Sequence, residues 1–169
     1  VGVSPSTDVW FASLVVVTSF AKLFMTGFIN EIFLPRLVRS WELSPRYAEH
    51  LISNIIVVFA IISIFGVLII FIYSSAMVEI MYSNIPENSR AKIVLMMRSV
   101  SPVLILIIMN EIFSMALNSR ELYSQPERAR IVSSSLNFVI IISLYSELNI
   151  WALYLATIIS HTVNSSFLI

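Results

Sequence analysis

The sequence predicts an all-α fold, a polytopic bundle of about five transmembrane helices. Of the 169 residues, 58% are hydrophobic and only 12% are charged, whereas soluble domains carry about 25% charged residues. The apolar residues gather in five runs close to the length of a spanning helix, about 20 residues. None of these runs alternates apolar and polar residues over about ten positions, as strands of a membrane barrel do. A single helical transmembrane domain over residues 1–169 is therefore expected.

The five predicted spans follow one another along the chain, separated by polar or turn-forming segments. They cover residues 9–34, 51–72, 93–117, 131–145 and 150–169. Ser44-Pro45, ahead of the second span, has the form of a helix start. The segment 84–89 is rich in turn-forming residues and predicts a turn. Only Ser146–Asn149 join the last two spans, so these two helices must be antiparallel neighbours.

Basic residues in the predicted links set the orientation, because positively charged links stay on the cytoplasmic side. Links 35–50 and 118–130 carry six basic residues, whereas the other two links carry only Arg90 and Lys92. We therefore expect links 35–50 and 118–130 in the cytoplasm and the start of the chain outside. An exported start without a signal peptide indicates a further span upstream. We expect the chain to be a fragment of a larger protein.

Several chemistries are excluded by residues that this sequence lacks. There is no cysteine, which excludes disulfides, thiolate catalysis and cysteine-based metal sites. His50 and His161 lack the spacing of metal ligands, and the three glycines form no phosphate-binding loop. We expect neither an enzyme nor a bound cofactor or metal.

The first span carries polar residues and one charge on a single face. Thr18, Lys22, Thr26 and Asn30 are four residues apart, so their side chains lie on the same side of the helix. A charge inside the bilayer costs roughly 2.5–3.5 kcal/mol on insertion scales. Two explanations remain open: the stripe lines a hydrated pathway, or Lys22 pairs with a carboxylate of a neighbouring helix.

Three further charged residues, near the ends of spans, suit gating or ion-pairing roles. Glu31 lies near the cytoplasmic end of the first span, where Arg36 or Arg39 is its simplest partner. Arg98 either extends to the lipid headgroups or pairs with Asp8, which lies at the same depth. Asp8 alternatively caps the first helix.

Glu111 in the third span is open to two interpretations. It either accepts Lys22 or acts as a proton-coupling carboxylate. Its neighbour Asn110 points about 100° away on the helix, so one of the two meets another helix. The fifth span carries a polar patch in which His161 either forms an interhelical hydrogen bond or titrates. The patch consists of Ser160, His161, Asn164 and Ser165.

Motifs along the chain follow one another in the order and spacing of a known family. Thr7–Phe11 and Phe24–Pro35 are similar to the beginning and end of that family's second helix. Leu95–Pro102 is similar to the segment that leads into the family's fourth helix. The loop before the family's fifth helix is similar to a segment here that contains Ala116–Asn118, Tyr123 and Pro126. The chain thus resembles the MurJ/MviN lipid II flippases, of the multidrug/oligosaccharidyl-lipid/polysaccharide exporter superfamily. The resemblance implies helices two to six, in the N-terminal lobe of a larger transporter.

The second helix departs from the family pattern at the residues that matter for substrate. Where the family has two adjacent arginines, this chain has Ala21 and Lys22. The resemblance therefore implies that Lys22 is the remaining cation for a lipid pyrophosphate, and a lysine lacks the bidentate fork of arginine. A polyprenyl-linked glycan other than lipid II is a possible substrate of such a divergent member.

The resemblance implies a flippase that moves a lipid-linked oligosaccharide across the bacterial inner membrane by alternating access, in peptidoglycan and cell-wall biosynthesis. Substrate would be bound by Lys22, Thr18, Thr26 and Asn30. Asp8, Arg98, Glu111 and Glu31 would form gates or ion pairs. The implied partners are membrane lipids, the glycan substrate and the remaining helices of the polypeptide, with no nucleic acid. Two alternatives remain: a cation-coupled exporter of drugs or polysaccharides from the same superfamily, and a non-transporting membrane scaffold.

Overall fold

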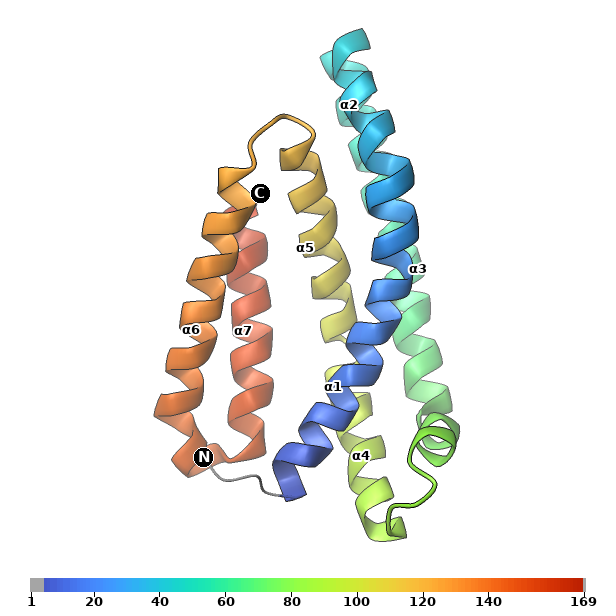
Figure 1. Cartoon of the computed structure of the whole chain (residues 1–169), viewed down its shortest axis with the longest axis vertical. Coiled ribbons are helices and arrows are strands. Elements are labelled where there is room, and N and C mark those ends of the chain that lie inside the picture. The colour runs from blue at the N-terminus through green and yellow to red at the C-terminus, as the bar shows by residue number, and fades with distance from the viewer. Residues whose placement is uncertain (1–4, 169) are drawn as a thin grey trace.

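The computed structural model describes the backbone of residues 5–168, and the side chains of that range apart from residues 5, 6, 24–27 and 30. This part of the chain is helical almost throughout and contains no strand, which confirms the predicted all-α fold (Figure 1). The elements are, in order, α1 (Pro5–Phe24), η1 (Met25–Phe33), α2 (Leu34–Leu43), α3 (Pro45–Met81), α4 (Glu87–Val100), α5 (Val103–Asn118), α6 (Ser124–Leu148) and α7 (Ile150–Leu168).

The first predicted span, residues 9–34, is longer and less regular than a single α-helix. The α1 helix passes into η1, a π-helix, which is a rare form usually seen as a single turn. The helix then continues as α2 beyond Leu34, because Pro35 lies in the first turn of α2, where proline is tolerated. The predicted polar link 35–50 is therefore helical up to Leu43. Ser44, with an extended backbone (φ −167°), ends α2, and Pro45 begins α3 as expected.

The third predicted span, residues 93–117, is divided at Pro102 into α4 and α5, which meet at an angle of 44°. A proline has no N–H and therefore frees the carbonyl group four residues earlier, here that of Arg98. The hydroxyl of Ser101 donates to this carbonyl oxygen at 2.9 Å. The bend thus keeps a hydrogen-bond partner for the freed group, as backbone within a membrane requires.

The fourth predicted span begins earlier in the structure than in the sequence analysis. α6 starts at Ser124 rather than near Ile131, because Pro126 lies in its first turn. Arg130 therefore belongs to the helix and not to a loop. Only Asn149 separates α6 from α7, with a positive φ of 49° that asparagine tolerates better than most residues. The two helices pack as antiparallel neighbours, as predicted (Figure 1).

The helices expose long apolar surfaces of the kind that face lipid. Within the described residues, α3 and α6 are each long and apolar enough to cross a membrane, and the bent α4–α5 pair adds a third if it is one span. The division into five spans stays a prediction. α3 exposes a continuous apolar strip formed by Val57, Val58, Ile61, Ile64, Phe65, Leu68, Ile69 and Ile72.

The bundle has two parts, which α5 connects. α1 and α3 pack against α4 and α5, whereas α7 packs against α5 and carries α6 on its other side. Figure 1 shows the α6–α7 pair on one side of α5 and α3 on the other. At Gly66 of α3, an added Cβ would lie 2.8 Å from Leu104 Cδ2 and 2.8 Å from Phe20 Cε1. The side of α5 that faces α1 and α3 is thus closely packed at Gly66.

Candidate functional site

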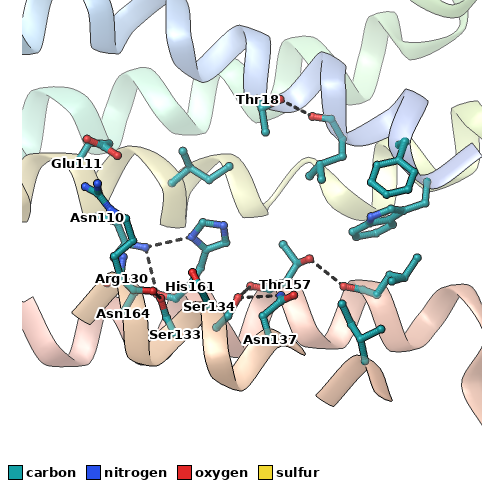
Figure 2. Close-up of a pocket in the computed structure, with 17 residues that line it drawn as sticks. Thr18, Asn110, Glu111, Arg130, Ser133, Ser134, Asn137, Thr157, His161 and Asn164 are labelled. Carbon is teal, nitrogen blue, oxygen red and sulfur yellow. Dashed lines mark hydrogen bonds between the residues drawn. The ribbon is translucent and has the colours of Figure 1, made fainter. Parts of the chain in front are cut away.

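A polar cavity of about 520 Å³ lies between α1, α5, α6 and α7 (Figure 2). Its apolar lining comes from Trp10, Phe11, Leu14, Ile107, Ile141 and Leu153. Its polar lining comes from Thr18, Asn110, Glu111, Arg130, Ser133, Ser134, Asn137, Thr157, Ser160, His161 and Asn164. So many polar groups inside a membrane bundle mark a hydrated space or a binding site, since lipid offers them no partners.

The α6 wall of the cavity is a polar stripe with helical spacing. Arg130, Ser133, Ser134 and Asn137 occupy consecutive turns of α6 on the side that faces α5 and α7. The opposite side of α6 exposes large apolar residues such as Val132 and Val139. Over these turns the polar side of α6 therefore faces the cavity and the apolar side faces away from it.

Arg130 and Glu111 are the two charged residues that line the cavity. Figure 2 shows Arg130 extending from α6 toward Glu111 on α5, and the positive charge of Arg130 acts on the Glu111 carboxylate. One guanidinium nitrogen of Arg130, Nη1, also donates to Glu127 Oε1 at 3.2 Å, one turn earlier on α6. Arg130 thus pairs with a carboxylate on its own helix and extends toward a second carboxylate on α5. Pairing with Lys22 was one of two expectations for Glu111; in the structure the charge of Arg130 acts on Glu111, although these two described residues form no ion pair.

Asn110 connects α5 to α7. Its Nδ2 donates to the carbonyl oxygen of His161 at 3.1 Å and contacts His161 Nδ1 at 3.2 Å. Its Oδ1 accepts a hydrogen bond from Ser165 Oγ at 2.6 Å. Asn110 is therefore the residue of the 110–111 pair that meets another helix, and His161 forms the interhelical hydrogen bond that was one of its two expected roles.

Asn164 leaves an acceptor unused at the cavity. Its Oδ1 is buried and has no hydrogen-bond partner among the described residues. The neighbouring polar contact, from Asn137 Nδ2 to Ser160 Oγ at 3.2 Å, joins α6 to α7 instead. A buried amide oxygen without a donor costs free energy. A ligand hydroxyl or a water molecule in the cavity would supply that donor.

The stripe predicted on the first helix is only partly placed in the cavity. Thr18 lines it and donates its hydroxyl to Leu14 O at 2.9 Å. Lys22 is exposed one turn further along the same face and is not among the lining residues. The side chains of Thr26 and Asn30 lie outside the described residues. Thr18 and Lys22 share one face of α1, so that face runs from the cavity toward η1.

The remaining predicted gating residues lie elsewhere. Arg98 donates from Nε to Ser74 Oγ at 2.8 Å and to Phe71 O at 3.2 Å, and its guanidinium lies over the Phe71 ring, 5.3 Å from the centroid. Its described partners are therefore on α3, and none is Asp8. Asp8 is exposed in the first turn of α1, and Glu31 is exposed on η1.

The α7 side of the site is expected from the sequence, whereas the α6 side is not. Arg130 is one of the six basic residues of the predicted cytoplasmic links, and Ser133, Ser134 and Asn137 lie within the predicted span 131–145 with no predicted role of their own. A signal was available: these residues repeat at three- and four-residue intervals within one helix. The described residues contain no group of three histidine or acidic side chains arranged to hold a metal. The site is thus a neutral hydrogen-bonding cavity with one positive and one negative residue at one end.

Comparison with known proteins gives one match. A family model described as "Lipid II flippase MurJ" matches residues 1–169, the whole chain. Neither the curated proteins nor the solved structures contain a significant match to this chain.

Proposed function

The chain belongs to the lipid II flippase MurJ family, and from that premise we propose that its polar cavity admits the headgroup of a lipid-linked oligosaccharide during transport across the bacterial inner membrane. The family is one of membrane transporters in peptidoglycan biosynthesis. The proposal assigns the polyprenyl tail to the lipid outside the bundle and the pyrophosphate-sugar headgroup to the polar space between α1, α5, α6 and α7. Alternating access of that space to the two membrane surfaces completes the transport cycle.

The observation that carries this proposal is the position of Arg130. It is the single cation among the residues lining the cavity, and a guanidinium binds phosphate oxygens through paired hydrogen bonds. The hydroxyl and amide groups of Ser133, Ser134, Asn137 and Thr157 suit sugar hydroxyls, which both donate and accept. The unused Asn164 Oδ1 suits a sugar O–H.

Lys22, Thr18, Thr26 and Asn30 remain the proposed substrate-binding stripe of the first helix. Lys22 follows Thr18 by one turn on the face that leads away from the cavity. In this arrangement Lys22 attracts the phosphates at the approach to the cavity, and Arg130 holds them inside. Two cations at different points of a path allow an anion to advance without being trapped at either.

The test is complementation by the full-length protein in a bacterium depleted of its own flippase. Arg130→Ala should abolish growth, and Arg130→Lys should restore part of it, since lysine keeps the charge without the fork. Arg128→Ala is the matched control, because Arg128 is an exposed arginine on the same helix that does not line the cavity. Membrane levels of all three variants must match the wild type. Growth of Arg130→Ala at the wild-type rate would refute the role of the cavity.

A second candidate function, cation-coupled export, is favoured by the position of Glu111. This carboxylate lines the same cavity and faces Arg130, so protonation of Glu111 would change the balance of charge around any substrate. Glu111→Gln should then remove the dependence of transport on an imposed proton gradient. If the protein is a flippase without proton coupling at Glu111, transport by Glu111→Gln and by the wild type should depend on the proton gradient to the same extent.

A further inference from the structure

A second cavity, at the opposite side of α1, differs in character from the first. It has a volume of about 460 Å³ and is lined by Val9, Ser89, Lys92, Leu95, Met96, Ser99, Ile150 and Trp151. Lys92 is its single charged residue. We propose that this groove binds a structural phospholipid of the bilayer, with the phosphate on Lys92 and an acyl chain along the apolar wall.

The groove has the dimensions and surface of an acyl-chain site. Its α4 wall runs from Ser89 to Ser99, eleven residues whose ten steps rise about 15 Å along the helix. Leu95 and Trp151 are 65% and 48% exposed, whereas Met96 beneath them is buried. Large apolar side chains left open around a buried floor suit an aliphatic chain and not a solvated ligand.

The mouth of the groove presents a lysine and three helix N-termini. Lys92 forms no ion pair within the described part of the chain. The three helices that line the groove, α1, α4 and α7, all begin at this end of the bundle (Figure 1). Helix N-termini carry partial positive charge and favour anions such as phosphate. The acidic residues Asp8 and Glu87 are close by in sequence but do not line the groove.

The level of the groove also fits the membrane surface. Lys92 lies in the second turn of α4 and Trp151 is the second residue of α7. Tryptophan and lysine at helix ends are the residues that sit at the boundary between hydrocarbon and headgroups. A phosphate at Lys92 would therefore occupy headgroup depth, and the chain would descend toward Ser99 in the hydrocarbon.

The test is native mass spectrometry of the full-length protein with phosphatidylglycerol or with diacylglycerol carrying the same acyl chains. Wild-type protein should retain phosphatidylglycerol about fivefold more than Lys92→Ala does. Diacylglycerol, which lacks the phosphate, should be retained weakly and equally by both. Lys92→Arg should retain phosphatidylglycerol as the wild type does. Arg36→Ala is the control, because it removes one exposed positive charge that does not line the groove.

A second variant tests the apolar wall independently of charge. Ser99→Phe fills the inner end of the groove and should lower retention of both lipids. Equal retention of phosphatidylglycerol by wild type, Lys92→Ala and Ser99→Phe would overturn the proposal. A photoreactive residue at Leu95 identifies the occupant directly. A lipid adduct supports the site, whereas a cross-link to another segment of the polypeptide overturns it.

Discussion

Asn110 on α5 contacts His161 on α7 twice, donating from Nδ2 to the carbonyl oxygen at 3.1 Å and contacting ring Nδ1 at 3.2 Å. Because the amide nitrogen is a donor, Nδ1 of His161 accepts, and the ring proton of neutral His161 lies on Nε2. Ser165 Oγ adds a third hydrogen bond to Asn110 Oδ1. One side chain thus holds the α6–α7 hairpin to the rest of the bundle by polar contacts.

Replacing Asn110 should loosen that connection. Asn110→Leu keeps the approximate volume and removes all three hydrogen bonds, leaving Ser165 and His161 with fewer partners. We expect a loss of about 1–3 kcal/mol of stability, measured as a lower unfolding temperature of the full-length protein in detergent. Asn118→Leu, at the end of α5, is the control. An unfolding temperature equal to wild type would show that the contact contributes little.

Gly66 should not accept a larger residue. A Cβ added at Gly66 would lie 2.8 Å from both Leu104 Cδ2 and Phe20 Cε1, so Gly66→Leu must displace these two side chains from their positions between the helices. Overpacking of this kind costs about 1–3 kcal/mol. Thermal unfolding is the measurement, with Ala76→Leu as control because Ala76 is exposed on the same helix. Equal effects of the two changes would contradict close packing at Gly66.

Lys22 should be required for transport and not for folding. Lys22→Ala is expected to lower flipping by about tenfold or more, the scale of a lost charged hydrogen bond, while expression is unchanged. Lys22→Arg should retain activity. Rates of headgroup exposure in proteoliposomes provide the measurement. A fully active Lys22→Ala variant would remove Lys22 from the substrate path.

Arg98 should be coupled energetically to Ser74 and not to Asp8. Its Nε donates to Ser74 Oγ at 2.8 Å, whereas Asp8 is absent from its described partners. Double-mutant cycles on unfolding free energy should give about 0.5–3 kcal/mol of coupling for Arg98→Ala with Ser74→Ala. The cycle with Asp8→Asn should be additive. Strong coupling between Arg98 and Asp8 would instead support the Asp8–Arg98 ion pair that is expected from their similar depth in the membrane.

The sequence predicted features that depend on composition and local pattern, and missed those that depend on packing. The all-α fold followed from the apolar runs, and the α6–α7 pairing from the short link at Ser146–Asn149. The partner of Arg98 was missed because it depends on how α3 lies against α4, which local pattern does not contain. The cavity was missed for a different reason. Its α6 wall begins at Arg130, which belongs to the predicted polar link 118–130, whereas in the structure Pro126 lies in the first turn of α6 and the helix already includes Arg130.

The bend at Pro102 has a mechanical consequence. The Ser101 hydroxyl satisfies the carbonyl of Arg98, and the Arg98 side chain donates to Ser74 of α3, so both polar groups next to the 44° bend have partners. If α4 and α5 keep this angle, the pair would move as one rigid unit. α4 has 14 residues and is about 21 Å long, so its far end stands about 15 Å from the axis of α5. A small rotation of α5 about its own axis would then move the far end of α4 sideways, parallel to the membrane surface. Rotation of α5 in one half of the bilayer would thus become a lateral shift of α4 in the other half.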